Sequence, residues 1–97
     1  MGHDEEKLVH KYVEALGQEY EAFYMYKDIF KHVGDHPHKN KIMSIMEEEF
    51  HHYETIFDML FPSDSQVVHT LLEDAFKKEL HRMKEEMMAC LEKMRRM

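Results

Sequence analysis

The stretch "VGDHPHKN", residues 33–40, separates two long segments whose apolar residues have helical spacing. Such breaks are rare in this chain, which has three Gly and two Pro among 97 residues. Gly34 is suited to end a helix in the left-handed conformation, Asp35 to cap the next helix, and Pro37 to occupy the first turn of that helix. Two amphipathic segments joined by so short a break predict an antiparallel helical hairpin.

A second break, "FPSDSQ" at residues 61–66, follows the hairpin. Pro62 stops a helix, and the segment from Ser63 to Gln66 has the form of a capping box. The predicted fold class is therefore all-α, with a two-helix hairpin and a long C-terminal helix in one domain spanning residues 1–97. The predicted helices cover residues of about 5–33, 37–61 and 64–95.

Apolar residues recur in alternating steps of three and four along each predicted helix, as a helix in a bundle requires. In the third helix this stripe has no polar interruption, so that helix is predicted to provide packing or an assembly surface. The stripe residues are Val9, Tyr12, Leu16, Phe23, Tyr26, Phe30 and Val33; then Ile42, Ile45, Ile56 and Met59; and finally Leu72, Phe76, Leu80, Met83, Met87, Leu91 and Met94.

Three polar residues occupy stripe positions in the first two helices: Glu19, Glu49 and His52. A carboxylate in an apolar stripe is costly unless it is paired or coordinates a metal. If the hairpin turns near residues 34–36, facing residues have numbers that sum to about 70, which places Glu19 opposite Glu49 and His52. Carboxylate and imidazole ligands suit iron, manganese or zinc, so these three residues form a candidate metal site.

One chain offers only half of a di-iron carboxylate centre, because such centres in four-helix bundles use a Glu from each of two helices and a Glu-x-x-His motif from each of the other two. Two hairpins related by a two-fold axis would supply four Glu and two His. Four carboxylates balance the charge of two divalent ions. The sequence therefore predicts a homodimer, or a larger even-numbered oligomer, that forms a four-helix bundle around two metal ions.

The composition excludes several function classes. Acidic residues outnumber basic ones by 20 to 13, and no basic stripe of the kind that binds nucleic acid is present. No apolar run approaches the length of about 18 residues that a membrane helix needs, and the acidic N-terminus is not a signal peptide. A single cysteine, Cys90, excludes an internal disulfide and fits a reducing compartment, so a cytoplasmic location is predicted.

The first two predicted helices resemble a half-bundle of the ferritin-like superfamily, closest to encapsulated ferritins and more distantly to rubrerythrins. The resemblance covers residues of about 8–61 and rests on Glu19 in "GQEYEAFYMY" and on Glu49-x-x-His52 in "EEEFHHYETIFDML". It implies a ferroxidase centre built by paired hairpins, with two iron ions at each dimer interface and Zn, Mn or Ca as substitutes. It also implies that Glu19, Glu49 and His52 are iron ligands, with Glu49 as the bridge between the metals. Tyr26 matches an aromatic residue near the centre and is a candidate catalytic residue that would hydrogen-bond a ligand or donate an electron.

The function expected from this resemblance is oxidation of Fe²⁺ by O₂ or peroxide, in iron storage or defence against oxidative stress. Residence inside an encapsulin-type shell would follow from it, although the final residues, "LEKMRRM", differ from the usual targeting tail. Two other readings are a protein that binds metal without turnover and a structural helical oligomer whose polar stripe residues specify the partner.

Other polar residues are interpreted differently. Glu48 and His51 lie about 100° round the helix from the predicted ligands and are expected to face solvent or another subunit. Glu21 competes with Glu19 if the hairpin register slips. The loop histidines, which are candidates for metal entry, and three His-x-x-x-Glu pairs are interpreted as surface residues. These are His32, His36 and His38 in the loop, and His10/Glu14, His69/Glu73 and His81/Glu85 on the predicted helices.

Overall fold

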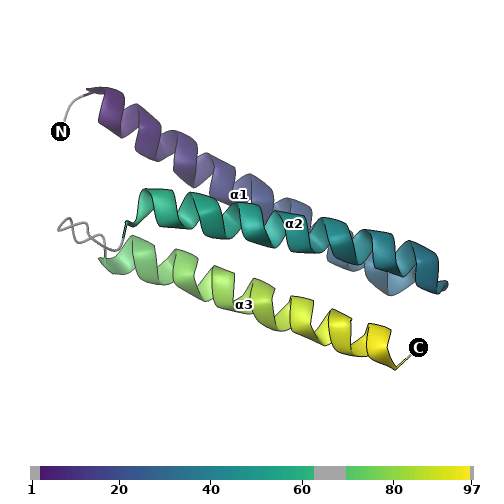
Figure 1. The fold of residues 1–97 in the computed structure, drawn as a ribbon. Helices are drawn as coiled ribbons and strands as arrows, with labels where there is room; N and C mark the ends of the chain where they lie inside the picture. The colour runs from purple at the N-terminus through teal and green to yellow at the C-terminus, as the bar shows by residue number, and fades with distance from the viewer. Residues whose placement is uncertain (1–2, 63–69, 97) are drawn as a thin grey trace.

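A computed structural model describes residues 3–62 and 70–96, which form three α-helices (Figure 1). These are α1 (His3–His32), α2 (His36–Leu60) and α3 (Thr70–Arg95). The all-α prediction is confirmed, and the observed ends of α1 and α2 lie within two residues of the predicted ones. The start of the third predicted helix and the proposed capping box fall largely outside the described residues.

The α1–α2 turn is closed by side chains. Asp35 caps α2 by accepting a hydrogen bond from the backbone N–H of His38 at 2.8 Å, and Pro37 lies in the first turn of α2, as predicted. The prediction that Gly34 adopts the left-handed conformation is wrong, since no described glycine has a positive φ. Instead, the carbonyls at the end of α1 bind side chains: His32 Nδ1 lies 2.8 Å from Asp28 O, and Lys39 Nζ donates to Phe30 O at 2.9 Å.

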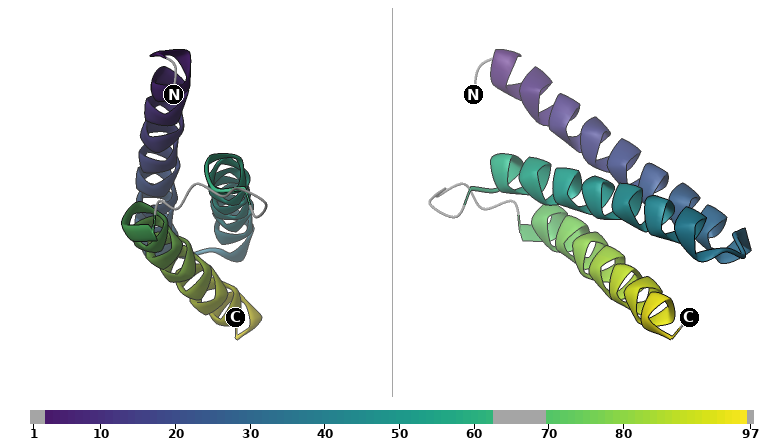
Figure 2. Two further views of the ribbon diagram at one scale, coloured as in Figure 1. Left: turned by 90° about the vertical axis from the view of Figure 1, so that its left-hand side faces the viewer. Right: turned by 45° about the vertical axis from the view of Figure 1, so that its right-hand side comes forward.

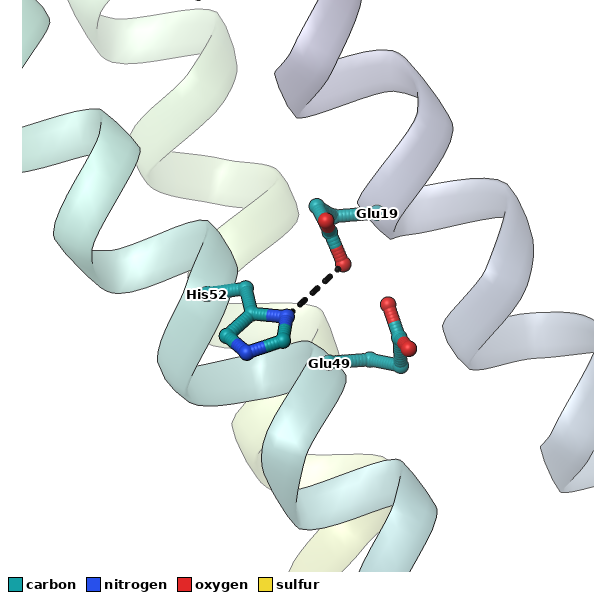
Figure 3. Close-up of side chains that lie close together, drawn as sticks. All are labelled: Glu19, Glu49 and His52. Carbon is teal, nitrogen blue, oxygen red and sulfur yellow. Dashed lines mark ion pairs between the residues drawn. The ribbon is translucent and has the colours of Figure 1, made fainter.

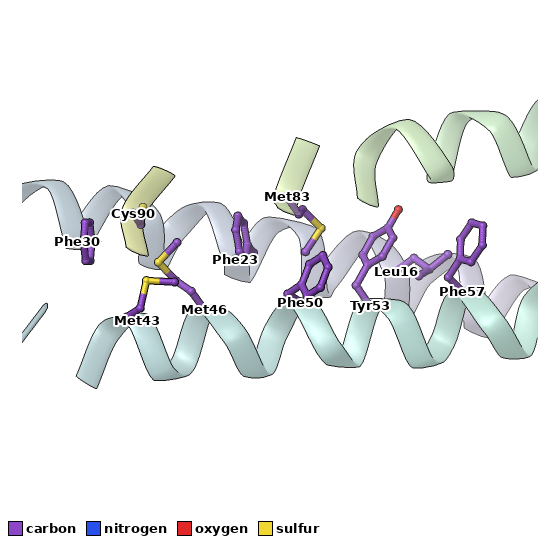
Figure 4. Close-up of a cluster of buried hydrophobic side chains, with 10 residues drawn as sticks. All are labelled: Leu16, Phe23, Phe30, Met43, Met46, Phe50, Tyr53, Phe57, Met83 and Cys90. Carbon is purple, nitrogen blue, oxygen red and sulfur yellow. The ribbon is translucent and has the colours of Figure 1, made fainter. Parts of the chain in front are cut away.

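The core runs along the hairpin and receives two residues from α3 (Figure 4). Ordinary helical spacing explains its α1 and α2 contributions, which recur in steps of three, four or seven. Burial raises the pKa of the Cys90 thiol, which fits a packing role for that residue. The buried core residues are Leu16, Phe23, Phe30, Met43, Met46, Phe50, Tyr53, Phe57, Met83 and Cys90.

The predicted stripe of α2 is not the buried one. The buried residues begin at Met43 and Met46, each one position beyond the predicted Ile42 and Ile45, while Met59 is 48 % exposed. The reason is that α2 packs against both α1 and α3, so the centre of its apolar face turns toward the space between those two helices. The predicted stripe lies along the edge of that face.

Helix α3 runs antiparallel to α2 and parallel to α1 (Figures 1 and 2). It packs chiefly against α2, and its Phe76 ring lies 6.3 Å from the ring of Phe61, the residue that follows α2, measured between centroids. It contacts α1 through polar groups, including an ion pair between Lys27 and Glu86. The third helix therefore packs against the other two helices of its own chain, which agrees with the packing role predicted for it.

The hairpin edge away from α3 remains partly exposed, and we call it the open face. It is apolar apart from the three predicted ligands, and helical spacing places its members together. The open face comprises Leu8, Ala15, Glu19, Ala22, Tyr26 and Ile29 of α1 and Ile42, Ile45, Glu49, His52, Ile56 and Met59 of α2.

Within the described residues, none of the three helices has an apolar window long enough to cross a lipid bilayer.

Candidate metal centre

The hairpin brings together the three residues selected from the sequence (Figure 3). Glu19 comes from α1, and Glu49 and His52 come from successive turns of α2. One ligand atom from each residue lies within 4.8 Å of the other two. The predicted register is therefore correct. Acidic clusters of this size are common in proteins that bind no metal, so their burial, electrostatics and donor chemistry must carry the assignment.

The cluster lies at the rim of the core. The Glu19 side chain is 24 % exposed and the His52 side chain is 57 % exposed. Among the described residues, no charged residue is fully buried. The three residues occupy the predicted stripe positions, but they are only partly buried because this stripe lies along the edge of the apolar face of α2. The residues remain accessible to an ion from solvent.

The two carboxyl groups interact unfavourably when both are charged. A hydrogen bond with Glu19, then burial and repulsion from the Glu19 charge, raise the pKa of Glu49 from 4.5 to about 7, and His52 acts in the opposite direction. His52 Nδ1 lies 3.5 Å from Glu19 Oε2, which is long for an N–H···O hydrogen bond. Within the described part of the chain, the buried Oε2 atom has no hydrogen-bond partner. A cation between these groups would offset the repulsion between the Glu19 and Glu49 carboxylates and would provide a partner for Glu19 Oε2.

The donor set of two carboxylates and one imidazole fits iron, manganese or zinc. Three ligands from one chain leave coordination positions open, as a reactive centre requires and a closed structural site does not. Tyr26, the predicted neighbour of the ligands, is partly buried on the same face of α1. It lies two turns beyond Glu19, about 10 Å along the helix axis.

The neighbouring pair Glu48 and His51 points away from this cluster. Both residues are exposed, and His51 Nδ1 lies 3.1 Å from Glu54 Oε1 on the outer side of α2. The expectation that they face solvent is confirmed for the isolated chain. Glu21 is exposed as well, so it does not compete with Glu19.

The loop histidines do not assemble into a site. His38 pairs with Asp35, His32 contacts the Asp28 carbonyl, and His36 is exposed. Within residues 3–62 and 70–96, the Glu19, Glu49 and His52 group is the one that meets a metal-ligand geometry. The three His-x-x-x-Glu pairs are therefore not part of such a group where they are described. His69 lies outside the described residues.

Sequence reasoning assigned no site role to two tyrosines behind the cluster, Tyr20 and Tyr53. They directly follow the candidate ligands Glu19 and His52, and their ring centroids lie 6.5 Å apart. Tyr53 is fully buried. The sequence shows that each tyrosine immediately follows a candidate ligand. Only the structure shows that both tyrosines contact α3.

Comparison with known proteins adds no assignment. No family model, curated protein or solved structure matches this chain. The geometry and chemistry of its own residues therefore carry the functional argument.

Proposed function

We propose that this chain supplies half of a di-iron carboxylate centre that oxidises Fe²⁺ with O₂ or peroxide. The observation that carries the proposal is the convergence of Glu19 with Glu49 and His52 on the open face. The three residues come from two helices, their donor atoms suit iron, and the buried Glu19 oxygen lacks a hydrogen-bond partner among the described residues.

A second copy of the chain completes the centre in this proposal. Apolar side chains continue the open face on either side of the cluster, and some of them are substantially exposed, such as Leu8 at 50 % and Ile29 at 38 %. Figure 3 shows α3 behind α2 and the three side chains in front of it, so a second hairpin would pack on the face that α3 does not cover. Two hairpins related by a two-fold axis form a four-helix bundle that contains four Glu and two His ligands.

The ligands then determine the chemistry of the two substrate ions. Carboxylate oxygens favour Fe³⁺ over Fe²⁺, so they promote loss of one electron from each ion. With two protons, these two electrons reduce O₂ to H₂O₂, or H₂O₂ to two molecules of water. His52 occupies one coordination position, and Glu49 releases its proton when metal binds near neutral pH. Such a reaction serves iron storage or the removal of peroxide.

Two neighbouring histidines provide a matched test. Fe²⁺ is added aerobically to the full chain, and the ferric absorbance and the molecular mass are followed together. We expect rapid oxidation by the wild type and by His51→Ala, with at least about 10-fold slower oxidation by His52→Ala because a ligand is lost. Equal rates in the two variants would contradict the assigned site.

The same experiment separates the other two functions. Binding of Fe²⁺ without acceleration of its oxidation indicates a non-catalytic metal-binding protein. The partly exposed apolar open face favours a structural helical oligomer as the second candidate. A dimer that neither binds metal nor changes mass on addition of Fe²⁺ would establish that function instead.

A further inference from the structure

Helix α3 contacts both ligand-bearing helices at the level of the cluster. The Tyr53 hydroxyl of α2 lies 2.6 Å from Glu79 Oε1 and 3.2 Å from Phe76 O, and the shorter distance identifies the Glu79 carboxylate as its main acceptor. Figure 4 shows this hydroxyl pointing toward α3. On the α1 side, Arg82 Nη1 donates to the Tyr20 hydroxyl at 3.3 Å.

These contacts close a loop through all three helices. Glu79 and Arg82 are three residues apart, so they share one face of α3. Their partners Tyr53 and Tyr20 meet across the α1–α2 interface with ring centroids 6.5 Å apart. We call these four residues the tyrosine clamp.

The clamp acts directly behind the ligands. Tyr20 follows Glu19 and Tyr53 follows His52, and successive side chains of a helix point about 100° apart. Fixing each tyrosine against α3 therefore sets the rotation of its helix at the ligand level. Tyr53 is fully buried, whereas the His52 side chain is 57 % exposed and makes fewer packing contacts of its own, so the fixed position of Tyr53 sets where the His52 backbone lies.

We propose that Glu79 and Arg82 of α3 are positioning residues for the metal centre, which they hold in register through Tyr53 and Tyr20. This inference rests on the proposed function, because it concerns the same three ligands. Neither α3 residue reaches the metal. They set the distance between Glu19 on α1 and the Glu49/His52 pair on α2. Loss of the clamp should widen the range of ligand separations and weaken metal binding without removing a ligand.

Glu86 provides the matched control. It lies seven residues after Glu79 on the same face of α3 and also binds another helix, through Lys27 of α1. Lys27 lies eight residues beyond Glu19, about 12 Å along α1, so its ion pair holds α3 to α1 away from the level of the ligands. A purely structural effect of α3 should therefore appear equally in Glu79→Ala and Glu86→Ala.

The test uses Co²⁺ titrations of the full chain, followed by visible absorption, with thermal unfolding measured in parallel. Outer-shell substitutions typically weaken metal binding by 10–100-fold, so we expect about 10-fold weaker Co²⁺ binding and an altered spectrum for Tyr53→Phe and Glu79→Ala. Glu79→Gln retains an acceptor for the Tyr53 hydroxyl and should keep the wild-type spectrum. Glu86→Ala should keep both affinity and spectrum.

Each outcome decides a different claim. Wild-type affinity and spectrum in Tyr53→Phe and Glu79→Ala would overturn the positioning role and leave the metal centre intact. Absence of Co²⁺ binding by the wild type would refute the centre and the positioning role together. If the buried Tyr53 variant unfolds, Arg82→Leu on the exposed surface of α3 replaces it, and an unchanged spectrum in that variant would likewise overturn the proposal.

Discussion

The two sides of the α1–α2 hairpin differ in composition and exposure. The side toward α3 is closed by fully buried residues such as Phe23, Tyr53 and Met83. The open face carries Glu19, Glu49 and His52 among apolar residues that remain partly exposed. This separation shows that one side stabilises the fold while the other retains accessible polar groups, so substitutions on the two sides should have different effects.

The largest expected effect is on the covered side. Phe23→Ala removes a side chain with 0 % exposure, and we expect a loss of about 3–5 kcal/mol in the free energy of unfolding because a cavity remains. Urea denaturation measures this loss. Met25→Ala, on the same helix at 52 % exposure, serves as the control and should cost less than about 1 kcal/mol. Similar losses in both variants would show that the burial of Phe23 does not determine the cost of its removal.

Self-association tests the open face. Ile45→Asn places an amide one turn from Glu49, and burying it in a dimer without a partner should weaken association by about 2 kcal/mol, or roughly 30-fold. Sedimentation measures the dimer dissociation constant. Leu71→Asn is the control because Leu71 is 87 % exposed on α3, away from the open face. Equal weakening by the control would place the interface elsewhere.

The pH dependence of apo-protein stability tests the carboxyl pair. The folded-state pKa of Glu49 is raised from 4.5 to about 7, so the folded state retains a proton that the unfolded state loses. Stability should therefore fall as pH rises from 4.5 to 7, by on the order of 1–2 kcal/mol after allowance for solvent screening. Glu49→Gln should flatten this slope in chemical denaturation series, and the exposed Glu48→Gln should not.

The smallest expected effect concerns the exposed pair. His51→Ala breaks an ion pair with Glu54 whose two side chains are 68 % and 44 % exposed, and we expect a loss below about 0.5 kcal/mol. Thermal unfolding measures it. A Co²⁺ affinity reduced as strongly as in His52→Ala would show that His51 also belongs to the centre.

Local patterns predicted the hairpin and the meeting of its polar residues. Asp35 and Pro37 mark the start of α2, and the rise per residue places Glu19 opposite Glu49 and His52 once the turn is known. Apolar spacing also predicted that Ile42 and Ile45 lie in the buried stripe of α2, whereas the buried residues are Met43 and Met46. An α2 face broad enough to contact two helices offers several adjacent apolar stripes, and the pattern alone does not rank them.

The sequence by itself determined the three helices, the turn between the first two and the identity of the clustered donors, because capping, helical periodicity and antiparallel register act over short distances. The tertiary structure decided how deeply each side chain is buried and which residues of α3 it contacts. Only the docking of α3 turns Met46 inward, leaves His52 at the rim and joins Tyr53 to Glu79, since these outcomes depend on competition between helices for one shared apolar face.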